Sequence, residues 1–250
     1  MNNKMSWLIN MKIAHRGYHS PETAPENSIR AFRNAIDEGF AIELDVHILK
    51  DDNVVVFHDD NLERMTGYNK NIEECTYDEI KSLKLLNTEE KIPLFSEVLS
   101  IVNGQVPLMI ELKNREKIGR LEQKLYDLLK MYTGDFVVQS FNPYSMGWFR
   151  KNASHIIRGQ LSCSYKNEHI EFYKKILLEN LVLNMISKPQ FVNYEIGYLS
   201  NLAVMIQKHR KLLVLGWTAR NKEEYEKAMK QCDNVVFEGF NPKMNKRVSS

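Results

Sequence analysis

Short apolar runs recur along the chain and alternate with longer stretches in which apolar residues return at every third or fourth position. A short apolar run is typical of a strand buried on both faces, and the longer spacing is typical of an amphipathic helix. The runs that we interpret as strands cover residues 11–15, 40–48, 106–113, 135–141, 155–162, 180–186, 212–218 and 234–240. Buried strands separated by helices predict parallel βαβ units, and eight such units make a closed (β/α)8 barrel, the TIM-type fold.

The stretches between the runs contain the expected helices. In the first, Ile29, Phe32 and Ile36 form one apolar face, and Gly39 marks the end of the helix. The helices expected on this basis cover residues 26–39, 117–132, 166–179 and 221–231.

One apolar run breaks the alternation. Residues 54–58 follow the strand at 40–48 after only five residues, "LKDDN", which are too few for a crossover helix. We therefore predict a tight turn and a short antiparallel return strand. The segment at about 60–92, ahead of the helix start in "IPLFSEVL", then becomes a short insertion over one end of a single barrel domain spanning residues 1–250.

Composition and charge limit the classes of partner and compartment. The formal net charge is only +2 and the basic residues are spread along the chain, which disfavours nucleic acid as a partner. Cys75, Cys163 and Cys232 have no metal or disulfide spacing. The N-terminal apolar run 7–9 is too short for a signal peptide, and no run could span a bilayer. We expect a cytoplasmic protein without stable membrane insertion, whose first ten residues are disordered or loosely docked; the oligomeric state stays open.

Ionisable and aromatic side chains gather at the carboxyl ends of the expected strands. In an α/β barrel these ends meet at one face, where the active site is built. Each residue alone is weak support, but the shared position of the set favours a site. The set comprises His15, Arg16, Glu43, Asp45, His58, Asp59, Glu111, Lys113, Trp217 and Glu238.

Strand alternation suggests a metal site within this set. Glu43, Asp45 and His47 project to the same side of one strand, and so do Glu111 and Lys113 on the next. Neighbouring buried carboxylates repel unless a cation neutralises them. Oxygen ligands favour Mg²⁺ or Ca²⁺, so we expect Glu43, Asp45 and Glu111 to bind a divalent ion. A structural Glu111–Lys113 ion pair is the alternative, and we expect His47 to form hydrogen bonds rather than bind metal.

The remaining residues suit phosphodiester chemistry. His15 and His58 could exchange protons with a nucleophile and a leaving alkoxide, while Arg16 and Lys113 balance the phosphate charge. The sequence alone does not order the histidines; we assign His15 to the leaving group and His58 to the attacking hydroxyl. Trp217 is either the floor of a substrate pocket or barrel packing. The histidines expected to face solvent are His19, His155, His169 and His209.

The stretch "IAHRGYHSPETAPENSIRAFRNAIDEGFAIELDVHILKDDNVVVFHDDNLERMTG", followed by "IPLFSEVL", "LMIELK", "VVQSF" and "WT", resembles the glycerophosphodiester phosphodiesterase family. The resemblance is most specific over residues 12–115. It implies a TIM-type barrel, a divalent metal, and hydrolysis of glycerophosphodiesters to an alcohol and sn-glycerol 3-phosphate. The family's motifs fall on His15 and Arg16, on the metal pair Glu43 and Asp45, on His58 and Asp59, and on Glu111 and Lys113.

The resemblance leaves alternatives open. It is compatible with attack by the glycerol 2-hydroxyl through a cyclic phosphate or with direct attack by water. Leu49, Arg220 and Glu238 depart from the family's usual Thr, Asn and Asp, which leaves substrate preference open. The same barrel could serve a lysophospholipase D-like or phosphoinositide phospholipase C-like enzyme, for which the aromatic segment 141–149 is a weak indication. A catalytically silent phosphate-binding module is the third reading.

Overall fold

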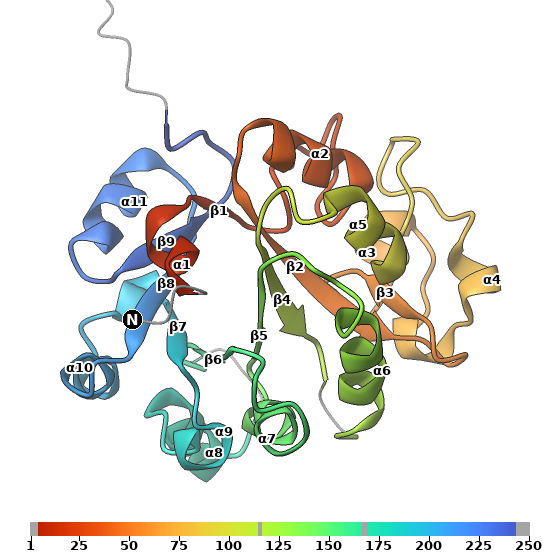
Figure 1. The fold of residues 1–250 in the computed structure, drawn as a ribbon. Helices are drawn as coiled ribbons and strands as arrows, with labels where there is room; N and C mark the ends of the chain where they lie inside the picture. The colour runs from red at the N-terminus through yellow and green to blue at the C-terminus, as the bar shows by residue number, and fades with distance from the viewer. Residues whose placement is uncertain (1–4, 115–116, 167–169, 244–250) are drawn as a thin grey trace, which may run out of the picture.

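Eight parallel strands close into a barrel around a central axis, with the helices outside them (Figure 1). The computed structural model describes residues 5–114, 117–166 and 170–243. The strands lie in the order β1-β9-β8-β7-β6-β5-β4-β2, and pairing of β1 with β2 closes the circle. Their bounds are β1 Ile13–Ala14, β2 Ala41–Ile48, β4 Leu108–Leu112, β5 Phe136–Ser140, β6 Arg158–Ser162, β7 Phe191–Glu195, β8 Leu213–Ala219 and β9 Asn234–Phe237.

Helices follow most strands, as the spacing of apolar residues predicts. Ser28 caps α2 by accepting a hydrogen bond from the Ala31 amide, and Gly39 adopts a left-handed conformation just past the helix end. The helices and short helical turns outside the insertion are α1 Trp7–Asn10, α2 Ile29–Asp37, α5 Phe95–Val102, α6 Arg120–Leu129, α7 Pro143–Asn152, α8 Phe172–Glu179, α9 Asn184–Ser187, η3 Ile196–Tyr198, α10 Leu202–His209 and α11 Lys222–Met229.

The start of the chain closes one end of the barrel core. Trp7 and Leu8 of α1 are buried and pack with barrel-interior residues such as Ile13 and Val236. Asn234 donates hydrogen bonds to the carbonyls of Leu8 and Met11. The expectation of a loosely docked start is therefore wrong for residues 5–10, because α1 covers apolar surface that would otherwise face water.

The prediction of a strand at residues 180–186 is also wrong. Residues 184–187 form α9, and Val182 and Met185 are 43% and 77% exposed. The barrel strand is β7, whose inward-facing Asn193 breaks the apolar pattern on which the prediction rested. The other expected runs all contain strands of the barrel, and the four expected helices all contain helices.

The insertion follows a hairpin, as expected. β3 (Val54–Val56) pairs antiparallel with β2 and leads into α3 (Glu63–Thr66), η2 (Ile72–Glu74) and α4 (Tyr77–Ile80). A small apolar cluster that includes Phe57, Met65 and Ile80 packs this segment against the hairpin. The insertion thereby extends the wall of the barrel beside the end of β2 (Figure 1).

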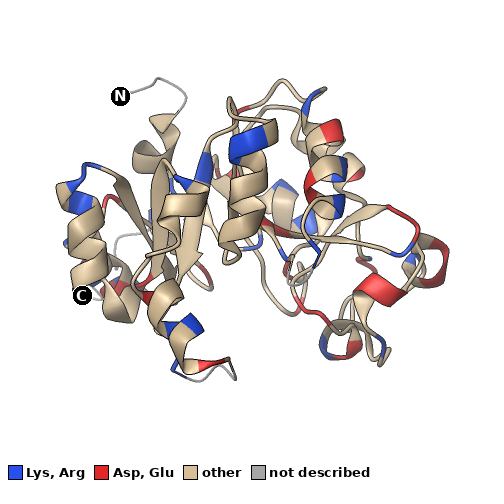
Figure 2. Cartoon of the chain, turned by 90° about the horizontal axis from the view of Figure 1, so that it is seen from below, with Lys and Arg blue, Asp and Glu red and all other residues tan. Residues whose placement is uncertain are grey.

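Charged residues are mixed over the surface. Figure 2 shows Lys and Arg interspersed with Asp and Glu on several elements of the face in view. Within the described part of the chain, no helix is both long and apolar enough to cross a membrane.

Candidate active site

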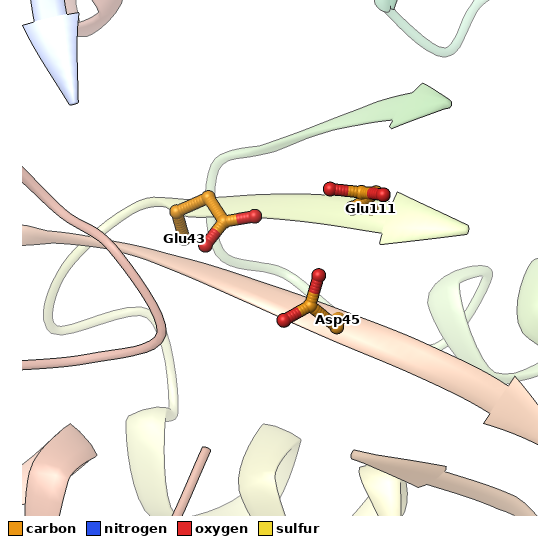
Figure 3. A group of neighbouring side chains, drawn as sticks. All are labelled: Glu43, Asp45 and Glu111. Atoms are coloured by element: carbon orange, nitrogen blue, oxygen red, sulfur yellow. The ribbon is translucent and has the colours of Figure 1, made fainter. Parts of the chain in front are cut away.

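Three carboxylates point into the barrel mouth from two adjacent strands. Glu43 and Asp45 lie on β2 and Glu111 on β4, with Asp45 and Glu111 directly opposite each other in the parallel register (Figure 3). Each side chain offers an oxygen within 4.8 Å of the oxygens of the other two. All three residues are buried, with at most 6% of their surface exposed. The structure therefore brings together the three residues that strand alternation selects.

The pKa values of the three carboxylates shift in different directions. Burial raises the pKa of Glu43 well above its usual value, and the negative charges of Asp45 and Glu111 raise it further. Burial raises the pKa of Glu111 as well. Burial also opposes ionisation of Asp45, yet the charges of Lys113, His58 and Arg16 outweigh it, so the pKa of Asp45 is lowered. Without further positive charge, Glu43 is the carboxylate that holds a proton.

Lys113 lies among these acids. Its Nζ is 2.9 Å from Asp45 Oδ1 and 2.6 Å from Glu111 Oε1. The Glu111–Lys113 ion pair therefore exists, but it is part of a larger cluster. His47 is buried outside the carboxylate group, with Nε2 3.2 Å from the carbonyl oxygen of His58, in agreement with a hydrogen-bonding role.

The donor set fits a hard divalent cation. It offers three carboxylate groups and no sulfur, which are the ligands that Mg²⁺ and Ca²⁺ prefer. Burial and the negative charges of Asp45 and Glu111 raise the pKa of Glu43, and a bound cation would stabilise its ionised form. Glu43, Asp45 and Glu111 could thus hold a divalent ion.

His15 follows β1 and contacts an acid from the opposite end of the chain. Its Nδ1 is 2.5 Å from Glu238 Oε2, and its Nε2 is 4.0 Å from Glu43 Oε2. Burial lowers the pKa of His15 to about 4, although the Glu238 hydrogen bond acts against this. Glu238 also accepts a hydrogen bond from Arg220 Nε at 2.7 Å. Arg220 and Glu238, the two residues that differ from the family's usual Asn and Asp, therefore form one ion pair next to His15.

The expectation for His19 is wrong. Its side chain is only 15% exposed, because it lies beside Glu238, which follows β9, with His19 Nε2 3.9 Å from Glu238 Oε2. His155 and His209 are exposed as expected, and His169 lies outside the described residues.

His58 follows the hairpin strand β3. Its Nδ1 is 2.7 Å from Asp59 Oδ1, and its side chain is 31% exposed. A carboxylate at Nδ1 keeps the proton on that nitrogen and leaves Nε2 as the exchanging atom. His15 has the same arrangement with Glu238. Each histidine therefore has its own carboxylate partner.

Arg16 is held by the carboxylates around it. Its amide donates to Glu43 Oε2 at 3.0 Å, and its Nη1 donates to Glu26 Oε1 at 2.8 Å. Its Nε lies 3.5 Å from Asp45 Oδ2. Burial acts to lower the pKa of Arg16, but the charges of Asp45 and Glu26 prevail and raise it. Glu26 therefore orients the guanidinium of Arg16.

Two residues of this cluster escape sequence reasoning. Asn27, the residue before the helix cap Ser28, donates from Nδ2 to Asp45 Oδ2 at 2.8 Å and adopts a left-handed backbone with φ of 58°. Arg64 in the insertion binds both Asp59 and Glu26. The only sequence signal was that Asn is common at positive φ.

A cavity of about 900 Å³ joins these residues. Its polar end contains His15, Arg16, His58, Glu43 and Glu111, and its end toward β6 and α8 is mostly apolar. Trp217 lines the cavity edge-on to Phe141, with ring centroids 5.5 Å apart, and its Nε1 donates to the Ser162 carbonyl. Trp217 therefore serves both as pocket wall and as packing. The apolar end is lined by Phe141, Pro143, Leu161, Tyr165, Ile170, Tyr173, Leu177, Leu178, Leu183 and Trp217.

Comparison with known proteins gives consistent results. Residues 15–240 match the model of the glycerophosphoryl diester phosphodiesterase family. The chain is 29% identical over 238 residues to a glycerophosphodiester phosphodiesterase of Caldanaerobacter subterraneus, covering 90% of this chain and 92% of that protein. It is 34% identical to the rat lysophospholipase D GDPD1 over 52% of this chain and 44% of that one. An Oleispira antarctica phosphodiesterase, solved in complex with the product sn-glycerol-3-phosphate, superposes with a TM-score of 0.77 at 22% identity, covering 92% of this chain and 93% of that one.

Proposed function

This chain belongs to the glycerophosphoryl diester phosphodiesterase family, and from that premise we propose that it hydrolyses glycerophosphodiesters to an alcohol and sn-glycerol 3-phosphate. One observation carries the proposal: two basic side chains, two histidines with carboxylate partners and the buried acids Glu43 and Glu111 line the same cavity, and Asp45 belongs to the same carboxylate group. The product bound to the Oleispira enzyme, which has the same fold, supports a substrate of this size and charge.

We assign Glu43, Asp45 and Glu111 as ligands of a divalent ion, Mg²⁺ or Ca²⁺. When bound, such an ion supplies Lewis-acid polarisation of a phosphoryl oxygen and balances charge in the transition state. The protein's own part is to hold the three carboxylates in place. Asn27 does this for Asp45, and the amide of Arg16 does it for Glu43.

Arg16 and Lys113 bind the non-bridging oxygens of the phosphodiester. Arg16 Nε is buried and donates no hydrogen bond to any residue that the structure describes, so it is available to a substrate oxygen. Lys113 has a raised pKa despite its burial, because Asp45 and Glu111 stabilise its charge, and it stays cationic at any physiological pH. Both groups would be worth more in this partly closed cavity than in water.

His15 and His58 move the protons. Because burial lowers the pKa of His15 to about 4, this histidine is neutral at pH 7 and suited to accept the proton of the attacking hydroxyl. His58 is oriented by Asp59 and more exposed, and in its doubly protonated form it donates the Nε2 proton to the leaving alkoxide and keeps the Nδ1 proton hydrogen-bonded to Asp59. This order reverses the one assigned from the sequence, where the burial of His15 could not be judged.

The apolar end of the cavity favours a second class of substrate. A soluble glycerophosphodiester does not need the aliphatic wall formed by Leu161, Leu177 and Leu178, whereas the acyl chain of a lysophospholipid would bury apolar surface there. A lysophospholipase D-like activity is therefore the second candidate.

A substrate panel separates the two candidates. Purified protein is assayed with glycerophosphocholine, glycerophosphoethanolamine and lysophosphatidylcholine below its critical micelle concentration, with Mg²⁺ or Ca²⁺. Phosphate-containing products are identified by mass spectrometry. Release of glycerol 3-phosphate from the first two supports the main proposal, and preference for the lysolipid supports the second. No product from any substrate, with folded protein, refutes both.

A further inference from the structure

Arg64 lies in the insertion, on the short helix α3, and binds the acid that holds His58. Its Nε is 2.6 Å from Asp59 Oδ2, and its Nη2 is 3.0 Å from Asp59 Oδ1. Two parallel hydrogen bonds of this kind fix both the distance and the orientation of a carboxylate. The pKa of Asp59 is lowered: burial acts to raise it, but the hydrogen bonds from His58 and Arg64 prevail.

The same guanidinium binds a second carboxylate on its other side. Nη2 is 2.7 Å from Glu26 Oε1, and Nη1 is 3.2 Å from Glu26 Oε2. A planar guanidinium can hold two carboxylates at once because its five N–H groups form a rigid fork, which the single ammonium group of a lysine does not offer. Arg64 therefore bridges the loop after β1 to the loop after the hairpin.

Each of the two carboxylates that Arg64 binds also contacts a side chain that lines the cavity. Asp59 Oδ1 pairs with His58 Nδ1 at 2.7 Å, and Glu26 Oε1 pairs with Arg16 Nη1 at 2.8 Å. His58 and Arg16 line the cavity, whereas Arg64 is not among its described lining residues. The order of contacts is thus His58, Asp59, Arg64, Glu26 and Arg16.

We propose that Arg64 is a positioning residue for the hydrolysis: it holds the proton carrier His58 and the phosphate-binding Arg16 at a set separation through Asp59 and Glu26. The inference rests on the proposed function. Arg64 is 49% exposed, and exposed ion pairs add little to stability. Loss of Arg64 should therefore change the kinetics far more than the melting temperature.

The test compares Arg64→Gln with a matched surface arginine. Arg120 is 45% exposed and also binds an aspartate, Asp52, at 2.7 Å, but it does not line the cavity. Arg64→Gln should lower kcat/KM by about 10- to 100-fold, with kcat reduced and KM raised. Arg64→Lys, which keeps the charge but not the fork, should fail to restore the loss. Arg120→Gln should match wild type.

A double-mutant cycle tests the route through Glu26. Glu26→Gln should act mainly on KM, since it frees Arg16. Because Arg64 and Glu26 act in one chain of contacts, the double variant should lose much less than the product of the two single losses. Independent, multiplicative losses would overturn the bridge, and so would Arg64→Gln kinetics within about twofold of wild type.

A readout without turnover keeps this inference separate from the proposed function. If wild type hydrolyses no substrate in the panel, the proposed function fails and the bridge is judged by the ¹⁵N shifts of the His58 ring. At a pH where the His58 ring is neutral, wild type and Arg120→Gln should show the Nδ1-protonated tautomer, and Arg64→Gln should show a mixture of tautomers. An unchanged His58 spectrum in Arg64→Gln would overturn the inference.

Discussion

Glu43 is the carboxylate of the site whose ionisation its surroundings oppose most. It is buried, it lies beside Asp45 and Glu111, and its nearest donor is the amide of Arg16 rather than a full positive charge. Burial and the neighbouring negative charges both raise its pKa. In the metal-free protein this carboxyl group therefore holds a proton at pH values where an exposed glutamate would be ionised.

Metal binding should release that proton. A ligand whose pKa is raised must lose its proton before it binds a cation, so metal affinity should keep increasing as pH rises beyond the range in which an exposed glutamate titrates. Calorimetry of Mg²⁺ and Ca²⁺ binding in two buffers of different ionisation enthalpy measures the proton count. Binding that releases no proton and does not vary with pH would contradict this account of Glu43.

The two histidines should matter to turnover and not to folding. His15→Asn and His58→Asn should each lower kcat by about 10²- to 10⁴-fold, because each removes a proton carrier while keeping a polar side chain of similar size. His155→Asn, at an exposed position, is the control and should keep wild-type kinetics. A loss of less than about tenfold in either active-site variant would remove that histidine from the proposed proton transfer.

Only part of the site could be predicted from the sequence. Glu43, Asp45 and Glu111 could be selected because alternation along a strand decides which side chains share a face. The roles of Asn27, Arg64 and Glu238 could not, because they depend on loop conformations and on contacts between distant segments. His15 and Glu238 are 223 positions apart and meet only because the barrel closes.

At the scale of elements, β6 and β7 show how the barrel interior limits side-chain size. Gly159 of β6 pairs directly with Phe191 of β7, and the Phe191 ring fills the space in front of it. An added Cβ at Gly159 would lie 2.1 Å from the Phe191 ring. Glycine is needed at Gly159 for this close approach rather than for an unusual backbone angle.

Gly159→Ala should therefore destabilise the barrel. Overpacking a filled core typically costs about 1–3 kcal/mol, and the fully buried Phe191 ring must shift to admit the new methyl group. Gly197→Ala is the matched control, since its Cβ would meet no atom within 4 Å. Urea unfolding of both variants gives the difference in the free energy of unfolding. Equal stability of the two variants would show that the core around Phe191 adapts freely.

The same elements explain which predictions from sequence succeed. β2 is recognised although it carries site residues at every second position, because its other face is kept apolar by Ile42, Leu44, Val46 and Ile48. β8 is recognised because its first five residues contain no polar side chain. The prediction fails around β7, because inward-facing Asn193 is needed at the cavity while exposed Val182 and Met185 mimic a strand on α9 and the turn before it. Polar residues of the site thus weaken the pattern that identifies the fold.

At the scale of the whole molecule, barrel closure brings the first and last strands together. β1 pairs with both β2 and β9, so His15 lies between the carboxylates of β2 and Glu238 at the end of β9. The hairpin and insertion add His58, Asp59 and Arg64 to the same end. The site therefore depends on the closed barrel and cannot form from the N-terminal motifs alone.

A metal titration of activity tests this account as a whole. Protein stripped with EDTA is titrated with Mg²⁺ or Ca²⁺, and release of glycerol 3-phosphate from glycerophosphocholine is followed for wild type and Asp45→Asn. The account predicts that wild type regains activity with saturating metal dependence, while Asp45→Asn, folded by circular dichroism, stays at least about 100-fold lower at every metal concentration. Full activity after metal removal, or wild-type activity in Asp45→Asn, would contradict it.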